Sequence, residues 1–364
     1  MPPDNEFLVF GTGAGANVVS PGDWAVDPER ITGFSQGLAR SSKANTVWRQ
    51  TSSMTAALAA LIIERTNRDM RDNGDVNALI AALRETFESF NPRELVEEPT
   101  RQYFVSEAGN NNNNGRTSGS AWRDIQYGVD FITDRLDFNH NQIILNVADG
   151  QNYQGFTLAG SPQGIQVPSH FLIRGNLANP SAVLVTGVSP GETAVSCGLG
   201  AMVTLEGMTL TAPNAGGVGL SVYRGSNAWF RLIDFAQCVA GHITGYDGAI
   251  INPIGPYRIT GSADRHYLLD GGSSVAIYPG GTSVSVTLSG LPGFSDAFVA
   301  VANHSTLSAI NLNFVGPATG RRHAINNLSL IHTNSGNINY FPGDQPGIPA
   351  SIGVMTGNGG LFVS

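Results

Sequence analysis

The sequence after residue 100 is a series of short runs in which apolar and polar residues alternate, separated by turns rich in Gly, Pro, Asn and Asp. A period of two is typical of β-strands with one buried face, and the turn residues end each strand. The segments AMVTLEGMTLTA (201–212) and TSVSVTLSG (282–290) are examples. Comparable positions return at intervals of roughly 20 to 30 residues, which is within the period range of solenoid proteins. This pattern predicts a stack of coils, one per repeat, although a β-sandwich would also contain many short strands.

The chain changes character near residue 100, which indicates more than one structural unit. Its 364 residues exceed the usual size of a single domain. The first 100 residues contain 14 acidic and 9 basic side chains among helical patterns, whereas only three glutamates follow. Forty-five glycines and a charged fraction of 13% fit an all-β composition better than an α/β one. We place the boundary at Glu97 to Gln102 and expect a helical unit over residues 1–100, a β-rich unit over 101–344 and an extension over 345–364.

The charge pattern excludes several classes of partner. A net charge of -8, with Lys43 as the only lysine, argues against a nucleic-acid-binding protein, which would carry clustered Lys and Arg. No basic segment followed by an apolar stretch opens the chain, and no apolar run approaches twenty residues. We therefore expect no nucleic-acid partner, no export signal and no membrane insertion.

Cofactor and metal motifs are also missing from the sequence. Gly11, Gly13 and Gly15 follow an apolar run, but their spacing departs from the dinucleotide-binding pattern Gly-x-Gly-x-x-Gly. The later histidines are dispersed without ligand spacing, so we expect no metal and no cofactor; they are His242, His266, His304, His323 and His332. Cys197 and Cys238 do not make a disulfide framework, and we interpret them as two buried thiols.

Two amphipathic helices are predicted in the first unit. The segment from Thr51 to Met70 has helical spacing and is followed by Asn73-Gly74, a typical helix end. Asp75 can then cap a second helix. The residues that recur at helical spacing in the first helix are Met54, Leu58, Leu61, Ile62 and Arg65, and the apolar stripe of the second is Val76, Leu79, Ile80, Leu83 and Phe87. Two helices alone bury little surface, so these stripes need each other plus the preceding segment, or copies from neighbouring chains.

Three segments of this unit resemble the N-terminal virion-attachment module of bacteriophage tail appendages. They are FLVFGTGAGANVVSPGDWA (7–25), GFSQGLARSSKANTVWRQTSSMTAALA (33–59) and DNGDVNALIAALRETF (72–87). The resemblance covers nearly the whole of residues 6 to 90. It implies that residues 1 to about 90 anchor the protein to a tail or baseplate, with candidate attachment residues Trp48, Leu58, Leu61, Leu79 and Leu83.

The segment YFVSEAGNNNNNGRTSGSAWRDIQYGVDFI (103–132) resembles the entry of pectate-lyase-like right-handed β-helices. There, a short strand, a loop ending in Asn-Asn-Gly and a capping helix occur in this order. The helix would cover the unpaired N–H and C=O groups of the end coil, and we expect it at about residues 122–134. Asparagine suits the loop because it tolerates left-handed backbone, although a run of Asn is also typical of a disordered linker. The resemblance implies a right-handed parallel β-helix.

Candidate residues for saccharide binding are few. Glycoside hydrolysis needs two carboxylates, and acids one or two coils apart on one face of a β-helix would have suitable spacing. We expect one such face, on successive coils, formed by Trp229, Asp234, Tyr246, Asp247, Tyr257, Asp264, His266 and Asp270. Each acid taken singly is typical of a turn, as in Tyr246-Asp247-Gly248. No catalytic residue can be assigned on this basis.

These observations lead to two functional expectations. In the first, the protein is a homotrimeric, non-enzymatic tail fibre or receptor-binding appendage of the virion, made in the host cytoplasm. Its partners would be tail or baseplate proteins and either a host surface polysaccharide or another tail protein. In the second, it is a tailspike that cleaves the polysaccharide as a hydrolase or lyase. The small number of glutamates and the absence of a recognisable acid cluster favour the first.

Overall fold

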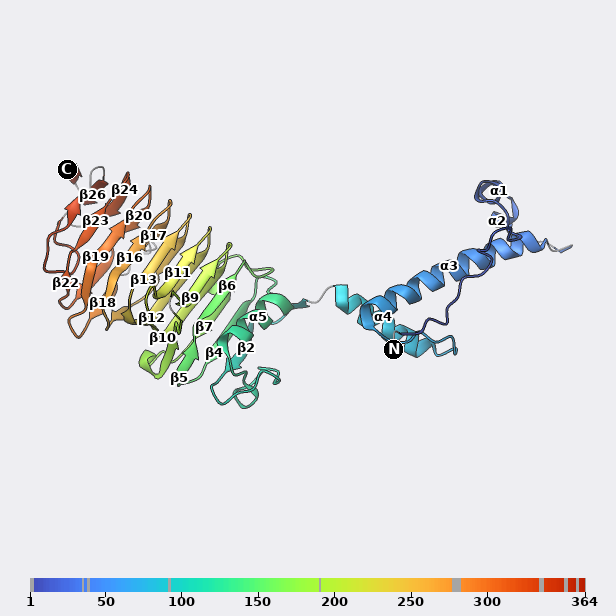
Figure 1. Cartoon of the computed structure of the whole chain (residues 1–364), viewed down its shortest axis with the longest axis horizontal. Coiled ribbons are helices and arrows are strands. Elements are labelled where there is room, and N and C mark those ends of the chain that lie inside the picture. The colour runs from blue at the N-terminus through green and yellow to red at the C-terminus, as the bar shows by residue number, and fades with distance from the viewer. Residues whose placement is uncertain are drawn as a thin grey trace. The chain divides into compact units, whose positions relative to one another are not determined.

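The computed structural model describes residues 3–34, 36–37, 40–90, 93–189, 191–276, 283–333, 337–349, 353–357 and 360–363. Within it the chain forms two compact units, residues 1–92 and 93–364, and each is described here by itself (Figure 1). No helix in these residues is long and apolar enough to cross a membrane.

The first unit is helical, with two long helices as expected but different bounds. Its helices are α1 (Pro21–Val26), α2 (Glu29–Thr32), α3 (Ser41–Thr66) and α4 (Val76–Phe90). The end expected at Asn73-Gly74 is wrong. Helix α3 ends earlier because Asn67 adopts the left-handed conformation and donates its backbone N–H to the Ile63 carbonyl. At the start of α4, Asp75 accepts a 3.0 Å hydrogen bond from the backbone N–H of Ala78, as predicted for a cap.

The core of the first unit is small. Ala59, Ile62, Met70 and Ala82 are buried, and Leu79 packs against them. Much of the two predicted stripes remains at the surface, since Met54 is 73% and Phe87 66% exposed.

The asparagine run is a built loop and not a linker. It follows β2 (Thr100–Val105) and includes the short 3-10 helix η1 (Ser118–Ser120). The Asn111 side chain accepts hydrogen bonds from the backbone N–H groups of Arg123 and Asp124, at 2.8 and 3.2 Å. The Asn113 side chain donates to the Ala121 carbonyl at 3.0 Å. These bonds tie the loop to the residues that enter the next helix.

Trp122 lies beneath this loop and shapes it. Its indole N–H donates to the Asn113 carbonyl at 2.8 Å, and its ring stacks on Tyr103 at a centroid distance of 5.1 Å. A Cβ atom on Gly115, whose φ is +67°, would lie 2.4 Å from the ring. Glycine is therefore required there for both conformation and space.

The capping helix is α5 (Ile125–Arg135), and it starts three residues later than the expected range of 122–134. Trp122 is instead extended and forms a parallel bridge with Val105. The buried face of α5 includes Ile125, Val129 and Ile132. From the same helix, the Gln126 amide pairs with the backbone of Thr157, accepting from its N–H at 2.7 Å and donating to its C=O at 3.0 Å. Helix α5 thus provides hydrogen-bond partners for backbone groups at the edge of a sheet, which is the role of a capping helix.

The second unit is mainly β, and its strands form three long faces of stacked parallel strands (Figure 1). The first face is β2, β4 (Gln142–Val147), β7 (Phe171–Arg174), β10 (Met202–Ala212), β12 (Asn227–Cys238), β14 (Ile250–Pro253), β17 (Ser274–Ala276), β20 (Thr306–Ser308), β24 (Ser329–His332) and β26 (Gly353–Gly357), with β27 (Gly360–Val363) antiparallel to β26. The second is β5 (Gly150–Gln154), β8 (Val183–Thr186), the later halves of β10 and β12, β15 (Tyr257–Ile259), β18 (Val284–Leu288) and β21 (Leu312–Val315).

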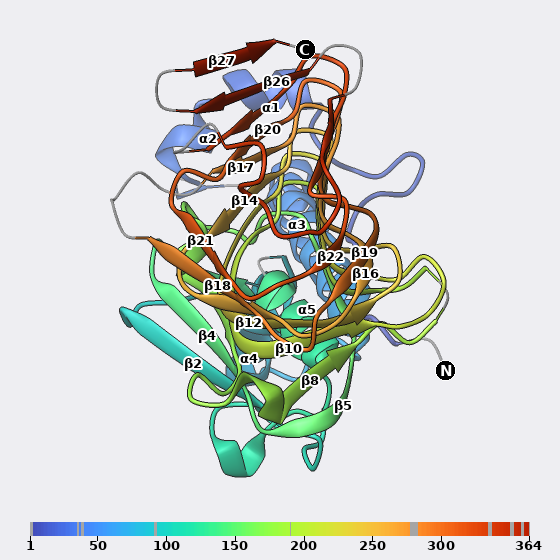
Figure 2. The same ribbon diagram turned by 90° about the vertical axis from the view of Figure 1, so that its left-hand side faces the viewer.

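The third face is β6 (Phe156–Ala159), β9 (Thr193–Gly198), β11 (Val218–Tyr223), β13 (Gly241–Tyr246), β16 (Ala263–Leu269), β19 (Gly293–Val301), β22 (Thr319–Gly320), β23 (His323–Ile325) and β25 (Ile348–Pro349). A separate pair, β1 (Glu94–Leu95) and β3 (Leu136–Asp137), and the 3-10 helices η2 (Pro168–His170) and η3 (Pro180–Ala182) complete the unit. Seen from the left-hand side of Figure 1, strands of successive coils lie one behind another (Figure 2).

The coil repeat follows the expected pattern. The register partners Leu172, Thr204, Trp229 and Asn252 lie 32, 25 and 23 residues apart. Parallel pairing of all these strands except β27 rules out the β-sandwich, whose sheets are antiparallel. The chain is therefore β-helix-like, with one continuous core of alternating inward side chains. Within residues 345–364, the strands β25 and β26 continue two of the faces and so lie along the last coils. Ile352 lies outside the described residues.

A stack of turns joins the third face to the first. Each turn carries residues with positive φ, including Arg224, Asp247, Asn303 and Asn327. The backbone N–H of one turn donates to a carbonyl of the next in five successive pairs: Gly200 to Arg224, Gly225 to Asp247, Gly248 to Gly271, Gly272 to Asn303 and His304 to Asn327. Because the turns stack in register, loop residues here are as firmly bonded as strand residues.

Candidate functional site

The structure divides the expected saccharide-binding face among three environments. Tyr257 and His266 are fully enclosed in the core and cannot contact a ligand, so their placement on a surface face was wrong. A register shift between Ala263 and Arg265 explains the error for His266, because it interrupts the simple alternation along β16.

In the core, these two residues belong to a buried polar chain. The Tyr257 hydroxyl lies 3.0 Å from both His266 Nε2 and the Tyr267 hydroxyl, and His266 Nδ1 lies 3.2 Å from His242 Nδ1. Burial lowers the pKa of His242 to about 3, although the nearby Ala236 backbone opposes this shift in part. His242 Nε2 nevertheless has no hydrogen-bond partner among the described residues. Burial likewise holds the pKa of His266 well below its usual value, with a smaller contribution from His242.

Trp229 and Asp234 lie on β12 among outward-facing positions. Asp234 is engaged, since it accepts from Arg258 at 2.6 Å and from the Thr260 hydroxyl at 2.8 Å. A second acid is also held by arginines. Glu206, which is fully buried, forms ion pairs with Arg174 and with Arg231, the latter at 2.6 Å. These acids are held in ion pairs and are poorly placed for proton transfer.

The remaining predicted residues lie elsewhere on the stack. Asp247 and Asp270 belong to the stacked turns, where the Asp270 carboxylate accepts from the Asn303 amide at 2.6 Å, and Tyr246, the last residue of β13, adjoins them. Asp264 is part-exposed at the start of β16. The structure therefore does not assemble the predicted residues into one groove.

The five candidate attachment residues divide in a similar way. Trp48 and Leu58, on α3, are 59% and 43% exposed, and Leu61 is half-buried. Leu79 and Leu83, on α4, pack against the small core of the first unit.

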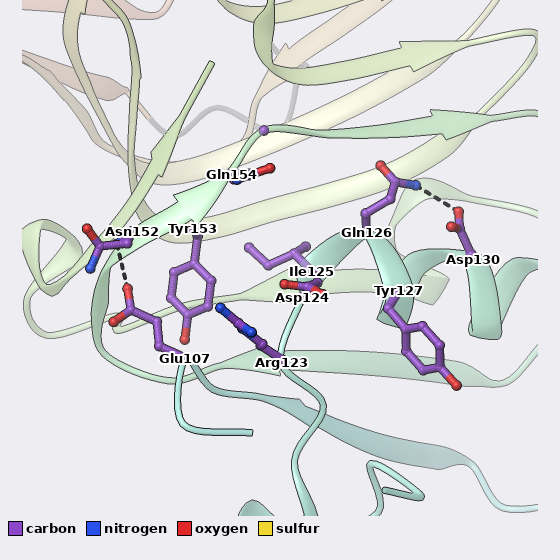
Figure 3. A pocket seen from close by; sticks show the side chains of 11 residues that line it. Glu107, Arg123, Asp124, Ile125, Gln126, Tyr127, Asp130, Asn152, Tyr153 and Gln154 are labelled. Atoms are coloured by element: carbon purple, nitrogen blue, oxygen red, sulfur yellow. Dashed lines mark hydrogen bonds between the residues drawn. The ribbon is translucent and has the colours of Figure 1, made fainter. Parts of the chain in front are cut away.

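A pocket that the sequence did not indicate lies beside the cap helix, and we call it the cap pocket (Figure 3). It has a volume of about 820 Å³. The loop after β2 contributes Glu107, the start of α5 contributes the segment from Arg123 to Asp130, and β5 contributes the segment from Asn152 to Gln154. The fold thus brings together three segments that are distant in sequence.

Hydrogen bonds fix the carboxylates of the cap pocket. Glu107 accepts from the backbone N–H of Asn152 at 2.5 Å, and Asp130 accepts from the Gln126 amide at 2.7 Å (Figure 3). Asp124 accepts from the Asn111 amide at 2.7 Å. Each bond occupies one oxygen of its carboxylate. Among the described residues none of these three acids forms an ion pair, although the Arg123 side chain lines the same pocket.

Two tyrosines add aromatic surface to the pocket. Tyr127 is 38% exposed. Tyr153 is buried and donates its hydroxyl to the Ala148 carbonyl at 3.0 Å, and burial raises its pKa to about 12. An exposed aromatic ring, that of Tyr127, beside carboxylates and amides suits a polyhydroxylated ligand, whose C–H face packs on the ring and whose hydroxyls donate to the acids.

The pocket does not have the composition of a metal centre. Among the described residues, no three His, Cys, Asp or Glu side chains gather closely enough to hold a metal ion. Cys197 and Cys238 are both buried and unpaired. Burial raises the pKa of each thiol to about 12, so both are unreactive.

The sequence contained only a weak signal for the cap pocket. Glu107 is one of three glutamates after residue 100, and Asp124 and Asp130 flank the expected cap helix. Only the loop closure around Trp122 brings them together. Comparison with protein-family models, curated proteins and solved structures gives no significant match to this chain.

Proposed function

We propose that this chain is a bacteriophage receptor-binding appendage of the tail-fibre type, in which residues 1 to about 90 dock on the tail or baseplate and the β-helix-like unit contacts a host surface glycan. The observation that carries the proposal is the uneven distribution of apolar surface. Among the described residues, thirteen large hydrophobic side chains of the first unit are exposed, as many as in the described part of the much longer second unit. Exposed apolar surface at this density marks a protein interface.

The proposed assembly is a homotrimer of right-handed β-helices. On α3, Val47, Met54 and Leu61 follow each other at seven-residue intervals, and Leu58 lies beside them. A seven-residue apolar repeat is self-complementary and supports packing against copies of the same helix. Right-handed connections between parallel strands are strongly favoured, which supports the proposed hand.

Light scattering of the full-length protein tests this assembly. We expect a trimer at micromolar concentration and dissociation in the double variant Met54→Lys/Leu58→Lys, because two charges would enter the apolar seam. Val315→Lys, at a similarly exposed position on β21, is the matched control and should remain trimeric. A monomeric parent protein would refute the trimer.

Glycan recognition is proposed for the cap pocket. Labelled full-length protein should adsorb to cells within a panel of bacterial strains, and periodate oxidation of surface diols should remove the adsorption. Tyr127→Ala should weaken adsorption several-fold. Tyr246→Ala is a matched control because Tyr246 has nearly the same exposure, 37% against 38%, but adjoins the stacked turns. If no strain adsorbs the parent, or if periodate has no effect, glycan binding is not the function.

Polysaccharide cleavage is the second candidate, and the three carboxylates of the cap pocket are the observation that favours it. Two of them could serve as general acid and as base or nucleophile. The purified protein is incubated with polysaccharide from an adsorbing strain, and new reducing ends are measured. Release that is lost in Glu107→Gln or Asp124→Asn but kept in Asp247→Asn and Asp270→Asn would make the protein an enzyme. Binding without release supports the non-enzymatic function.

A further inference from the structure

A second hollow crosses the place where successive coils enter the third face, and we call it the coil groove. It has a volume of about 510 Å³ and is lined by five coils in order, within the segments 237–239, 262–264, 293–295, 319–320 and 344–345. Neighbouring coils are separated by about 4.8 Å, so the groove extends for about 19 Å along the stack. Its long direction follows the stack axis, perpendicular to the strands.

The floor of the groove is made of tightly packed backbone. Ala263 and Phe294 are buried there. Gly320 has a φ of +100°, and a Cβ atom at this position would lie 2.1 Å from the Phe294 carbonyl oxygen. Only glycine fits this position. The floor is therefore fixed in shape, and a ligand would not need to order it.

Polar groups recur along the rim at nearly every coil. The Ser262 hydroxyl accepts from the Gly293 N–H at 2.9 Å, and the Ser295 hydroxyl donates to Asp264. Asp344 accepts from the Gly320 N–H at 2.7 Å. In the described part of the chain, the second oxygen of each carboxylate has no hydrogen-bond partner. Repeated acceptors one coil apart suit a ligand that itself repeats.

The charge of the lining selects among such ligands. Asp264 and Asp344 line the groove, and none of its lining residues is Lys, Arg or His. Of the arginines that follow on the neighbouring strands, Arg265 and Arg321 pair with Asp296, at 2.6 and 3.5 Å, and Arg322 donates to the Asn339 side chain and the Gly343 carbonyl. A chain bearing carboxylates or phosphates would be repelled by the groove, whereas neutral hydroxyls donate strong hydrogen bonds to carboxylates.

We propose that the coil groove binds an extended, neutral saccharide chain lying along the stack axis. This inference rests on the proposed function as a glycan-binding appendage and adds to it a second site, separate from the cap pocket, together with the charge class of the ligand. The coil groove holds several consecutive sugar residues of the polymer, while the more enclosed cap pocket holds a shorter segment of it.

The test uses full-length protein on an array of bacterial polysaccharides that contains both neutral and acidic chains. Ser295→Trp fills the groove from an exposed position, and Asp264→Asn removes one charge with little change of shape. Thr287→Trp, exposed on β18 of the second face, is the matched control. We expect retention on neutral chains to fall at least tenfold in Ser295→Trp and several-fold in Asp264→Asn, with no change in Thr287→Trp. Circular dichroism verifies that each variant is folded.

Other outcomes overturn the inference. It fails if Ser295→Trp is retained like the parent, if the parent is retained only by acidic chains, or if no neutral chain retains it. Adsorption to bacterial cells is measured in parallel. If the parent and Ser295→Trp adsorb equally, the coil groove is refuted while the proposed function stands. If the parent adsorbs to no strain, the proposed function itself fails.

Discussion

The buried histidine pair makes stability depend on pH in a way that can be tested at His242. Burial keeps this imidazole neutral in the folded state and lowers its pKa to about 3, whereas the unfolded chain has the ordinary value of 6.5. Below pH 6.5 the unfolded state therefore binds a proton that the folded state cannot accept. The stabilisation is fully present above this pH, falls as the pH decreases toward 3, and is constant below that.

The magnitude follows from the two pKa values. Each pH unit in this range changes the free energy of unfolding by about 1.4 kcal/mol per histidine. Between pH 7 and pH 5 the His242 contribution amounts to about 2 kcal/mol. His266 adds a loss of the same sign, because burial also lowers its pKa.

The perturbation is His242→Phe, which keeps a ring beside Phe235 and Phe294 but cannot titrate. Urea unfolding of the full-length protein, followed by tryptophan fluorescence, is measured at pH 7 and pH 5. The variant is expected to be less stable at pH 7, because His266 Nδ1 loses its neighbour, but to lose about 2 kcal/mol less than the parent on acidification.

Phe235→Leu is the control, since it weakens the same cluster without removing a titrating group. It should show the same pH dependence as the parent. Equal losses in the parent and in His242→Phe would refute the reasoning, because His242 would then be accessible to protons in the folded state.

Three further predictions concern the cap and the coil faces. Gly115→Ala should destabilise the second unit by about 3 kcal/mol in thermal unfolding, because alanine at this position would have an unfavourable positive φ and would clash with Trp122. Gly225→Ala is the control, because Gly225 also has positive φ but has open space around it, and this variant should lose only about 1 kcal/mol. Gln126→Leu should accelerate amide hydrogen exchange at Thr157 and cost about 1–3 kcal/mol, because an edge N–H and C=O lose their partners; unchanged exchange would show that Gln126 does not protect this edge. Glu206→Gln should lower stability by about 3 kcal/mol in urea, since Arg174 and Arg231 lose a buried counter-ion; a difference below 0.5 kcal/mol would mean that the arginines simply turn to water.

The coil architecture could be predicted because strand alternation is a local property. Val203, Leu205, Phe230 and Phe235 are all apolar residues within alternating runs, and all are buried. The repeat interval could also be read directly, since register partners recur at the spacing of the turns. In the same way, Asp75 was identifiable as a cap from its place before an apolar stripe.

The candidate site could not be predicted in the same way, because it depends on contacts between distant segments. Tyr257 and His266 have the residue types of a saccharide-binding surface, yet the core holds them because each satisfies the other's polar atoms. Glu107 and Asp124 become neighbours in one pocket only after the asparagine loop has folded over Trp122. Neither the burial of Tyr257 and His266 nor the formation of this pocket can be recognised from the alternation of apolar and polar residues in the sequence.

The stacked turns have a further consequence for the electric field of the molecule. In a parallel sheet, successive hydrogen bonds alternate in direction, so their dipoles largely cancel. In the five turn pairs that begin at Gly200, every N–H points toward the next coil and every carbonyl points back. Each of these bonds is flanked by one that runs the other way, such as Asn227 N–H to the Ala201 carbonyl and Ile250 N–H to the Ser226 carbonyl, so the dipoles of this edge also largely cancel. The stacked turns therefore give the second unit a fully hydrogen-bonded edge without a macrodipole, so charged side chains, and not the backbone, set the electric field along it.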